Sequence, residues 1–199
     1  MDNKKKNRHI MNRFKTGRSH DCLPFATTRK VTRGDLPEIY AHFGYTVGAE
    51  IGVSRGKHSK WMCEKVPNLK LYCIDPYIVY HVRRVKERQQ QIYEFACKFL
   101  ADYNAEVIRK TSMEAVKDFD DESLDFVYID GNHKFDYVMT DLIFWAQKVK
   151  SGGMIALHDY CHFHWAGIVK AVNAYTYSHS ISPWFITREE KPTVFWVKE

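Results

Sequence analysis

The feature that most constrains this chain is the stretch TVGAEIGVSRGKHS at residues 46–59. An apolar run carries Glu50 near its end, and a loop with Gly52 and Gly56 follows at once, before a segment of helical character. A strand, a glycine loop and a helix in this order form a cofactor-binding turn in α/β proteins. Glycine lets the backbone come close to a ligand because it has no Cβ. The stretch therefore predicts a cofactor site at the end of the first strand.

Apolar runs alternate with helix-forming segments from residue 46 to residue 177. The expected strands lie at residues 46–51, 69–74, 105–108, 124–129 and 154–157, with a closing pair at 184–187 and 193–197. Apolar strands joined by helices indicate a parallel sheet covered on both faces. We therefore expect a single-domain α/β fold, a Rossmann-like, doubly wound, mostly parallel sheet with an antiparallel C-terminal strand pair.

Polar residues stand at the ends of four of these strands. Glu50 precedes the glycine loop, Asp75 and Asp130 follow two later strands, and the pair His158 and Asp159 follows a fourth. In parallel sheets, ligands bind at the carboxyl ends of the strands. These side chains are therefore expected to meet at one binding edge.

The spacing of the residues in and after the loop limits which cofactors the site could bind. Asp75 lies 19 residues after Gly56, which suits a hydrogen bond to ribose hydroxyls. The second glycine of a dinucleotide fingerprint is replaced by Ser54. A phosphate-binding P-loop also fails, because the loop is one residue short and His58 stands where a serine or threonine is needed. The pattern indicates an adenosine cofactor without a pyrophosphate.

Four motifs taken together, AEIGVSRGKHS, CIDPY, DFVYIDGNHKFDYVMTDL and SGGMIALHDY, resemble those of class I S-adenosylmethionine-dependent methyltransferases. The most similar subgroup holds the small-molecule O-methyltransferases of the macrocin and catechol type. The resemblance covers about residues 46–197 and implies a methyltransferase domain at residues 21–199 with S-adenosylmethionine as its cofactor.

The resemblance also implies roles for single residues. Asp75 would take both ribose hydroxyls, which is a charge-assisted contact. Asp130 would lie near the sulfonium or a metal. The remaining residues expected at the cofactor are Glu50, Gly52, Ser54 and Gly56 around the loop, and Ser112 and Met113 beside the adenine.

Methyl transfer to a hydroxyl requires removal of its proton, by a base or with the help of a metal. The resemblance implies a magnesium ion held by Asp130 and Asp159, since oxygen ligands suit Mg²⁺. His158 stands beside Asp159 as a further ligand, and its imidazole leaves Mn, Fe or Zn open. His133 is expected to be catalytic with Asp130, either as the base or as a metal ligand.

The expected function is methyl transfer from S-adenosylmethionine to a hydroxyl of a small molecule or glycan. Residues 77–84 are expected to form a lid, with Tyr160, Phe163 and Trp165 at the mouth. One alternative is a nucleic-acid methyltransferase that uses a basic N-terminal tail. Another is a metal-dependent oxygenase with an iron site at His133, His158 and Asp159.

The net charge of +6 comes entirely from residues 1–20, which hold seven basic side chains and one acidic one. We expect this stretch to be a disordered tail that is able to contact nucleic acid or anionic lipid. A membrane span is not expected, because no apolar run approaches about 20 residues. The five cysteines lack CxxC spacing, which favours reduced thiols. We expect a cytoplasmic protein and leave a homodimer open.

Overall fold

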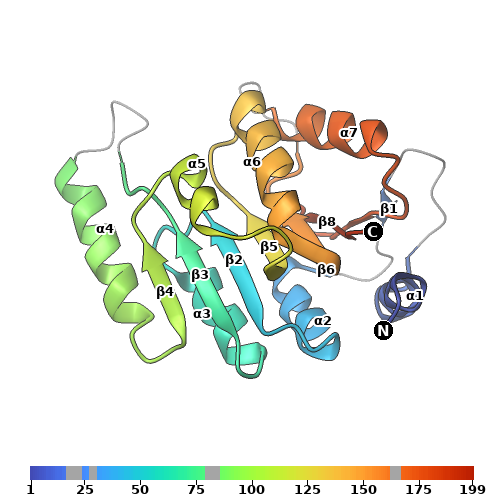
Figure 1. Cartoon of the computed structure of the whole chain (residues 1–199), viewed down its shortest axis with the longest axis horizontal. Coiled ribbons are helices and arrows are strands. Elements are labelled where there is room, and N and C mark those ends of the chain that lie inside the picture. The colour runs from blue at the N-terminus through green and yellow to red at the C-terminus, as the bar shows by residue number, and fades with distance from the viewer. Residues whose placement is uncertain (17–23, 27–30, 79–85, 162–166) are drawn as a thin grey trace.

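An eight-stranded sheet forms the centre of the computed structural model, which describes residues 1–16, 24–26, 31–78, 86–161 and 167–199 (Figure 1). The strand order is β1-β7-β8-β6-β5-β2-β3-β4. In that order the strands span Phe25–Ala26, Phe185–Ile186, Val194–Val197, Val149–Leu157, Leu124–Ile129, Val47–Ile51, Lys70–Ile74 and Ala105–Ile108.

The pairing confirms the expected fold class. Strands β6, β5, β2, β3 and β4 run parallel to one another, whereas β8 is antiparallel to both β6 and β7. The two-residue strand β1, which pairs parallel with β7, was not expected from the sequence. The strand order reverses between β2 and β5, and ligands of open α/β sheets bind at such a reversal.

Helices cover both faces of the sheet, so its strands are apolar along most of their length instead of alternating. In β5 every residue except Asp125 is buried. One core cluster packs α6 (Phe135–Lys148) and α7 (Ile168–Ser178) on one face. The other packs α1 (Asn3–Phe14), α2 (Leu36–His42) and α3 (Lys57–Lys65) on the opposite face. Helix α4 (Lys86–Phe99) flanks the edge strand β4 (Figure 1).

Two connections are short. Helix α5 (Ser112–Ala115) continues into a 3₁₀ turn, Val116–Asp118, before β5. A second 3₁₀ turn, Arg33–Asp35, leads into α2.

Strand β6 begins at Val149, five residues earlier than expected, and α7 begins at Ile168.

The N-terminal stretch corrects one prediction. Residues 3–14 form helix α1 and are not a disordered tail. Ile10 and Phe14 are fully or almost fully buried, and the Lys6 ammonium donates to the Tyr45 hydroxyl at 3.2 Å. Lys6, Ile10 and Phe14 are spaced four residues apart and therefore share one helix face. The many basic residues of this segment conceal the helical spacing of its buried residues in the sequence. Residues 17–20 lie outside the described part of the chain.

Among the described helices, none is long and apolar enough to cross a membrane.

Candidate active site

The glycine loop lies against the turn that follows β5. Gly52 has a φ of 91°, and a Cβ built on it would lie 2.1 Å from the carbonyl oxygen of Asp130. Only glycine fits at this contact. Gly56, at φ 74°, precedes α3, and Ser54 also has a positive φ, 51°. The loop therefore brings its backbone close to Asp130, at the reversal of strand order.

Asp75 joins the end of β3 to this loop. Its Oδ2 accepts hydrogen bonds from the backbone amides of Val53 at 3.1 Å and Ser54 at 2.9 Å. Its Oδ1 accepts from the amide of Tyr77 at 2.8 Å. The carboxylate thus fixes the loop conformation, and its contact with a ribose stays a prediction.

Glu50 lies beneath the loop and is only 2% exposed. One carboxylate oxygen lies 2.9 Å from Nδ1 of His58, and the other accepts a hydrogen bond from the Ser59 hydroxyl. Both contacts join β2 to the first turn of α3. The structure therefore gives Glu50 a positioning contact, and a contact with the cofactor itself stays a prediction.

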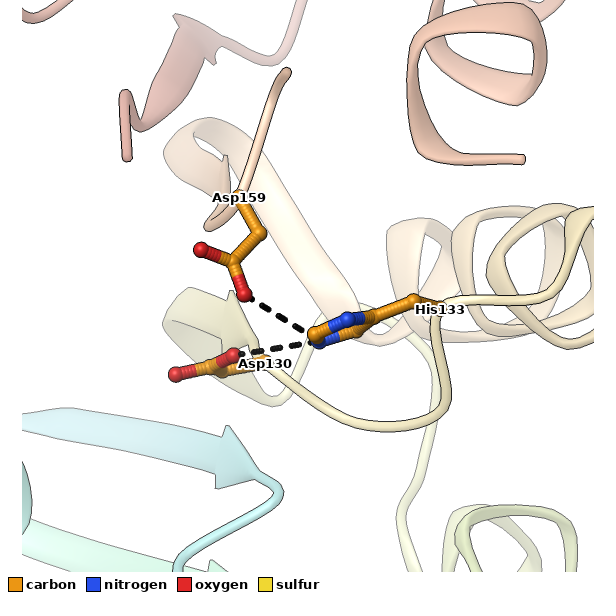
Figure 2. Close-up of side chains that lie close together, drawn as sticks. All are labelled: Asp130, His133 and Asp159. Atoms are coloured by element: carbon orange, nitrogen blue, oxygen red, sulfur yellow. Dashed lines mark ion pairs between the residues drawn. The ribbon is translucent and has the colours of Figure 1, made fainter. Parts of the chain in front are cut away.

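Two acids and a histidine converge beside the loop. Asp130 follows β5, Asp159 follows the neighbouring β6, and His133 lies between β5 and α6. Nε2 of His133 lies 3.7 Å from Oδ1 of Asp130 and 3.4 Å from Oδ2 of Asp159 (Figure 2). The three donor atoms all lie within 4.8 Å of one another. We call Asp130, His133 and Asp159 the acidic cluster.

His158 and Arg33 contact the other oxygens of the same acids. Nδ1 of His158 lies 3.5 Å from Oδ2 of Asp130 and 3.2 Å from Oδ1 of Asp159. A guanidinium nitrogen of Arg33 lies 3.5 Å from Oδ2 of Asp130. Of the predicted metal ligands, the structure brings Asp130 and Asp159 together with His133, and His158 lies on the other side of the two carboxylates.

These contacts set the charges of the buried groups. Burial opposes ionisation of Asp130, but the imidazoles of His133 and His158 and the charge of Arg33 outweigh it and lower the pKa to about 2. Burial also disfavours a charged His158, yet its ion pairs with Asp130 and Asp159 outweigh burial and raise its pKa to about 9. The pKa of Asp159 is lowered in the same way, since His158 outweighs its burial. The acids are therefore ionised at neutral pH.

Arg33 was missed by the sequence analysis. Its backbone amide donates to the Glu189 carboxylate at 2.7 Å, and Glu189 in turn accepts from the Thr187 hydroxyl at 2.8 Å. The C-terminal strand pair thus holds the 3₁₀ turn that presents Arg33 to Asp130. Asp130 is 97 residues away in sequence, and no local pattern marks such a contact.

Ser112 opens α5 and lies against α6. Its hydroxyl donates to Asp141 and accepts from the Trp145 indole nitrogen at 2.7 Å. Burial raises the pKa of Asp141 to about 6, against the opposing effect of Ser112. Met113 is half-buried and packs on the core. Asp141 was also missed, although it lies within one of the quoted motifs.

The expected mouth is only partly described. The Tyr160 hydroxyl donates to Asn173 at 2.7 Å, and its ring packs edge-on against Trp184. Residues 79–85, which make up most of the expected lid, lie outside the described residues, as do Phe163 and Trp165.

The donors fit the expected groups. Two carboxylates and an imidazole facing one point suit a divalent cation of the Mg, Mn or Fe type. Gly52 is required by this packing itself, because a side chain there would collide with the backbone of Asp130 and Gly131.

A family model described as a methyltransferase domain matches residues 49–160, more than half of the chain. The chain belongs to this family. Its fold and its strand-end motifs are those of a class I S-adenosylmethionine-dependent methyltransferase, as the sequence predicted.

Two solved structures share the fold. An O-methyltransferase from Bacillus cereus, in complex with SAH, has a TM-score of 0.62 at 13% identity, over 86% of this chain and 84% of that one. An rRNA methylase from Streptococcus thermophilus has a TM-score of 0.58 at 13% identity, over 82% and 94%.

A curated relative, the uncharacterized protein y4gI of Sinorhizobium fredii (strain NBRC 101917 / NGR234), is 31% identical over 81 residues. The match covers 41% of this chain and only 8% of the relative's length.

Proposed function

We propose that this protein is an O-methyltransferase that transfers the methyl group of S-adenosylmethionine to a hydroxyl of a small molecule or glycan, with a divalent cation at the acidic cluster. One observation carries the proposal. The backbone of the glycine loop touches the backbone of Asp130, whose side chain belongs to the cluster. The predicted cofactor site and the predicted cation site are therefore adjacent, with the backbone of Asp130 between them.

The two sites supply complementary chemistry. S-adenosylmethionine brings an electrophilic methyl group, and a bound divalent cation lowers the pKa of a coordinated hydroxyl. Asp75 and the loop amides it holds would orient the cofactor, and Asp130, His133 and Asp159 would hold the cation. We assign His133 as a ligand in preference to a base, because its Nε2 faces both carboxylates. His158 and Arg33 would keep the opposite carboxylate oxygens in place.

Binding and transfer are tested in order. Calorimetry with S-adenosylhomocysteine, with and without Mg²⁺, measures cofactor binding. Transfer of a labelled methyl group to a panel of catechols, other phenols and sugars then measures activity. We expect cofactor binding, transfer to at least one hydroxyl and loss of transfer with EDTA. A folded protein that does not bind S-adenosylhomocysteine at millimolar concentration would overturn the methyltransferase proposal. Transfer that persists in EDTA would overturn only the cation.

A nucleic-acid substrate is the second candidate, favoured by the fold likeness to an rRNA methylase. Three exposed basic side chains of α1, Lys4, Lys5 and Arg8, are poorly placed for it. Helix α1 contacts Gly152, near the start of β6, whereas Asp159 follows the end of that strand. At about 3.3 Å per residue, the two lie roughly 20 Å apart. The basic helix face is thus remote from the acidic cluster.

The triple variant Lys4→Gln, Lys5→Gln, Arg8→Gln tests this candidate without removing the buried Lys6. If the protein methylates RNA and the variant loses that activity while still binding S-adenosylhomocysteine, the second candidate replaces the first. An unchanged activity on a small hydroxyl acceptor supports the first.

The oxygenase alternative has less support. An iron site of that class uses two imidazoles and one carboxylate. Among the described residues, the donor atoms that converge come from one imidazole and two carboxylates.

A further inference from the structure

Helix α1 presents three cations around a surface groove. The groove lies between the first two turns of α1 and strand β6, and its lining consists of Asp2, Asn3, Lys4, Lys5, Arg8 and Ser151. Lys4, Lys5 and Arg8 are exposed. Asp2 is the one acid among the described residues 1–16, and its carboxylate accepts a hydrogen bond from the Lys5 backbone amide at 2.8 Å. The lining, which we call the α1 groove, therefore carries a net positive charge.

The helix that carries these cations is fixed to the sheet. The Asn3 side-chain amide donates to the carbonyl of Lys198 at 3.1 Å, and the Lys6 ammonium donates to the carbonyl of Gly152. Both carbonyls belong to the segments beside the groove, since Gly152 follows Ser151 and its amide donates to the same Lys198 carbonyl. A ligand does not have to order this helix when it binds, which lowers the cost of association.

The positive charge of the chain is concentrated on this segment. Residues 1–20 hold seven of the 30 basic side chains and one of the 24 acidic ones, so the remainder of the chain holds 23 of each. A cationic patch on an otherwise neutral body attracts polyanions and speeds their association. The charge distribution therefore favours a polyanionic partner at α1.

The side chains of α1 favour one class of polyanion. Helices that bind lipid surfaces insert an apolar face, but Ile10 and Phe14 are buried in the core and Met1 is the one exposed large apolar side chain among residues 1–16. Proteins that bind single-stranded nucleic acid stack bases on aromatic rings, and the exposed side chains of the same residues include none. Lysine and arginine contacts with the phosphates of a duplex need neither feature.

We propose that the α1 groove is a docking surface for the phosphate backbone of duplex nucleic acid, without readout of the base sequence. This surface goes beyond the proposed function, because it contacts the start of β6 whereas Asp159 follows the end of that strand. The two lie roughly 20 Å apart. A duplex held at α1 is thus a docking partner, and the hydroxyl acceptor is a different molecule.

Fluorescence anisotropy of a labelled duplex of arbitrary sequence and about 20 base pairs measures this binding at about 25 to 150 mM NaCl, with DNA in one arm and RNA in the other. We expect a Kd of about 10⁻⁶ to 10⁻⁴ M at the lowest salt concentration in at least one arm. The triple variant Lys4→Gln, Lys5→Gln, Arg8→Gln should make the slope of log K against log salt shallower by about two to three, because each lost phosphate contact removes about one. Its affinity for S-adenosylhomocysteine should stay unchanged.

The triple variant Lys98→Gln, Lys117→Gln, Lys170→Gln is the matched control, because it removes the same charge from exposed positions elsewhere. It should keep the slope of the unaltered protein. If neither duplex binds at low salt, or if both triple variants change the slope equally, the inference is wrong. Binding to vesicles of phosphatidylserine and phosphatidylcholine without binding to either duplex would also overturn it.

Arg8→Gln alone should reduce the slope by about one, and it decides the matter if the triple variant does not fold. Binding of S-adenosylhomocysteine by the unaltered protein is measured in parallel. Its absence would overturn the proposed function and leave the docking surface standing, whereas its presence without duplex binding would do the reverse.

Discussion

Two acids on either side of the same turn, the half-buried Asp130 and the buried Asp141, behave in opposite ways. Asp130, at the end of β5, has a pKa lowered to about 2 because His133, His158 and Arg33 outweigh its burial. Asp141, in α6, has a pKa raised to about 6 because burial outweighs its one hydrogen bond, from Ser112. Asp130 faces two imidazoles and a guanidinium, whereas Asp141 has one hydroxyl as its hydrogen-bond partner.

The difference separates the two halves of the site. Around Asp130 the protein stabilises negative charge, so the carboxylates are deprotonated, as ligands of a cation must be. Around Asp141 burial disfavours the ionised carboxylate, whose one hydrogen bond comes from the Ser112 hydroxyl. The chemistry is therefore expected in the Asp130 half, and cofactor binding in the half with Asp75.

The largest effect is expected from Asp130→Asn, which keeps the shape but removes the charge. Methyl transfer should fall by about 1,000-fold, equivalent to about 4 kcal/mol of barrier. Affinity for S-adenosylhomocysteine should change little. Asp121→Asn, at an exposed acid paired with Lys148, is the control and should remain active. A kcat/KM for Asp130→Asn near that of the control contradicts the role of the Asp130 half.

Asp141→Asn should raise stability at neutral pH. The folded pKa of about 6 lies above the ordinary value, so the folded state binds more protons between about pH 4 and pH 6, and stability falls as pH rises through this window. The contribution lost is about 3 kcal/mol, and the amide does not titrate.

Urea unfolding at pH 4 and pH 7 tests this prediction. The advantage of Asp141→Asn over the unaltered protein should appear on going from pH 4 to pH 7. An equal difference at both values of pH would show that Asp141 lies in a well-compensated setting like that of Asp130.

Asp75→Ala should weaken S-adenosylhomocysteine binding by roughly 30-fold, because a charged acceptor contributes about 1.5–3 kcal/mol. The variant also releases the amides of Val53 and Ser54, which the carboxylate now holds. Asp102→Ala, at an exposed acid, is the calorimetric control. An affinity of Asp75→Ala for S-adenosylhomocysteine equal to that of the control would show that Asp75 does not contribute to cofactor binding.

Arg33→Ala should give the smallest effect, roughly a fivefold loss of kcat/KM from one partly exposed ion pair (~1 kcal/mol). Arg33→Lys should recover part of it, since the positive charge returns without the planar fork. Arg8→Ala, on the exposed face of α1, should be neutral. An unchanged kcat/KM in Arg33→Ala would show that the imidazoles alone hold Asp130.

The sequence predicted the parts of the site that depend on local order. An apolar run followed by an acid located Asp75, Asp130 and Asp159 at strand ends, because the carboxyl ends of parallel strands share one edge. The same logic predicted the parallel sheet and its antiparallel closing pair.

Contacts between distant segments could not be predicted this way. Arg33 reaches Asp130 across 97 residues, and Lys6 reaches Gly152 across 146. The imidazole of His133 lies between Oδ1 of Asp130 and Oδ2 of Asp159 because of the path of the turn after β5. No periodicity of the sequence encodes that path. In α1 the charges misled, because the apolar spacing of Ile10 and Phe14 is what determines packing.

We propose that Asp130, His133 and Asp159 hold a divalent cation beside the cofactor. Electron paramagnetic resonance of Mn²⁺, titrated into protein saturated with S-adenosylhomocysteine, measures this without a known acceptor. We expect the free-ion signal to be suppressed up to one Mn²⁺ per chain in the unaltered protein and in Asp121→Asn, but not in Asp159→Asn. A folded protein that binds S-adenosylhomocysteine yet leaves the free Mn²⁺ signal undiminished at millimolar metal would contradict the claim.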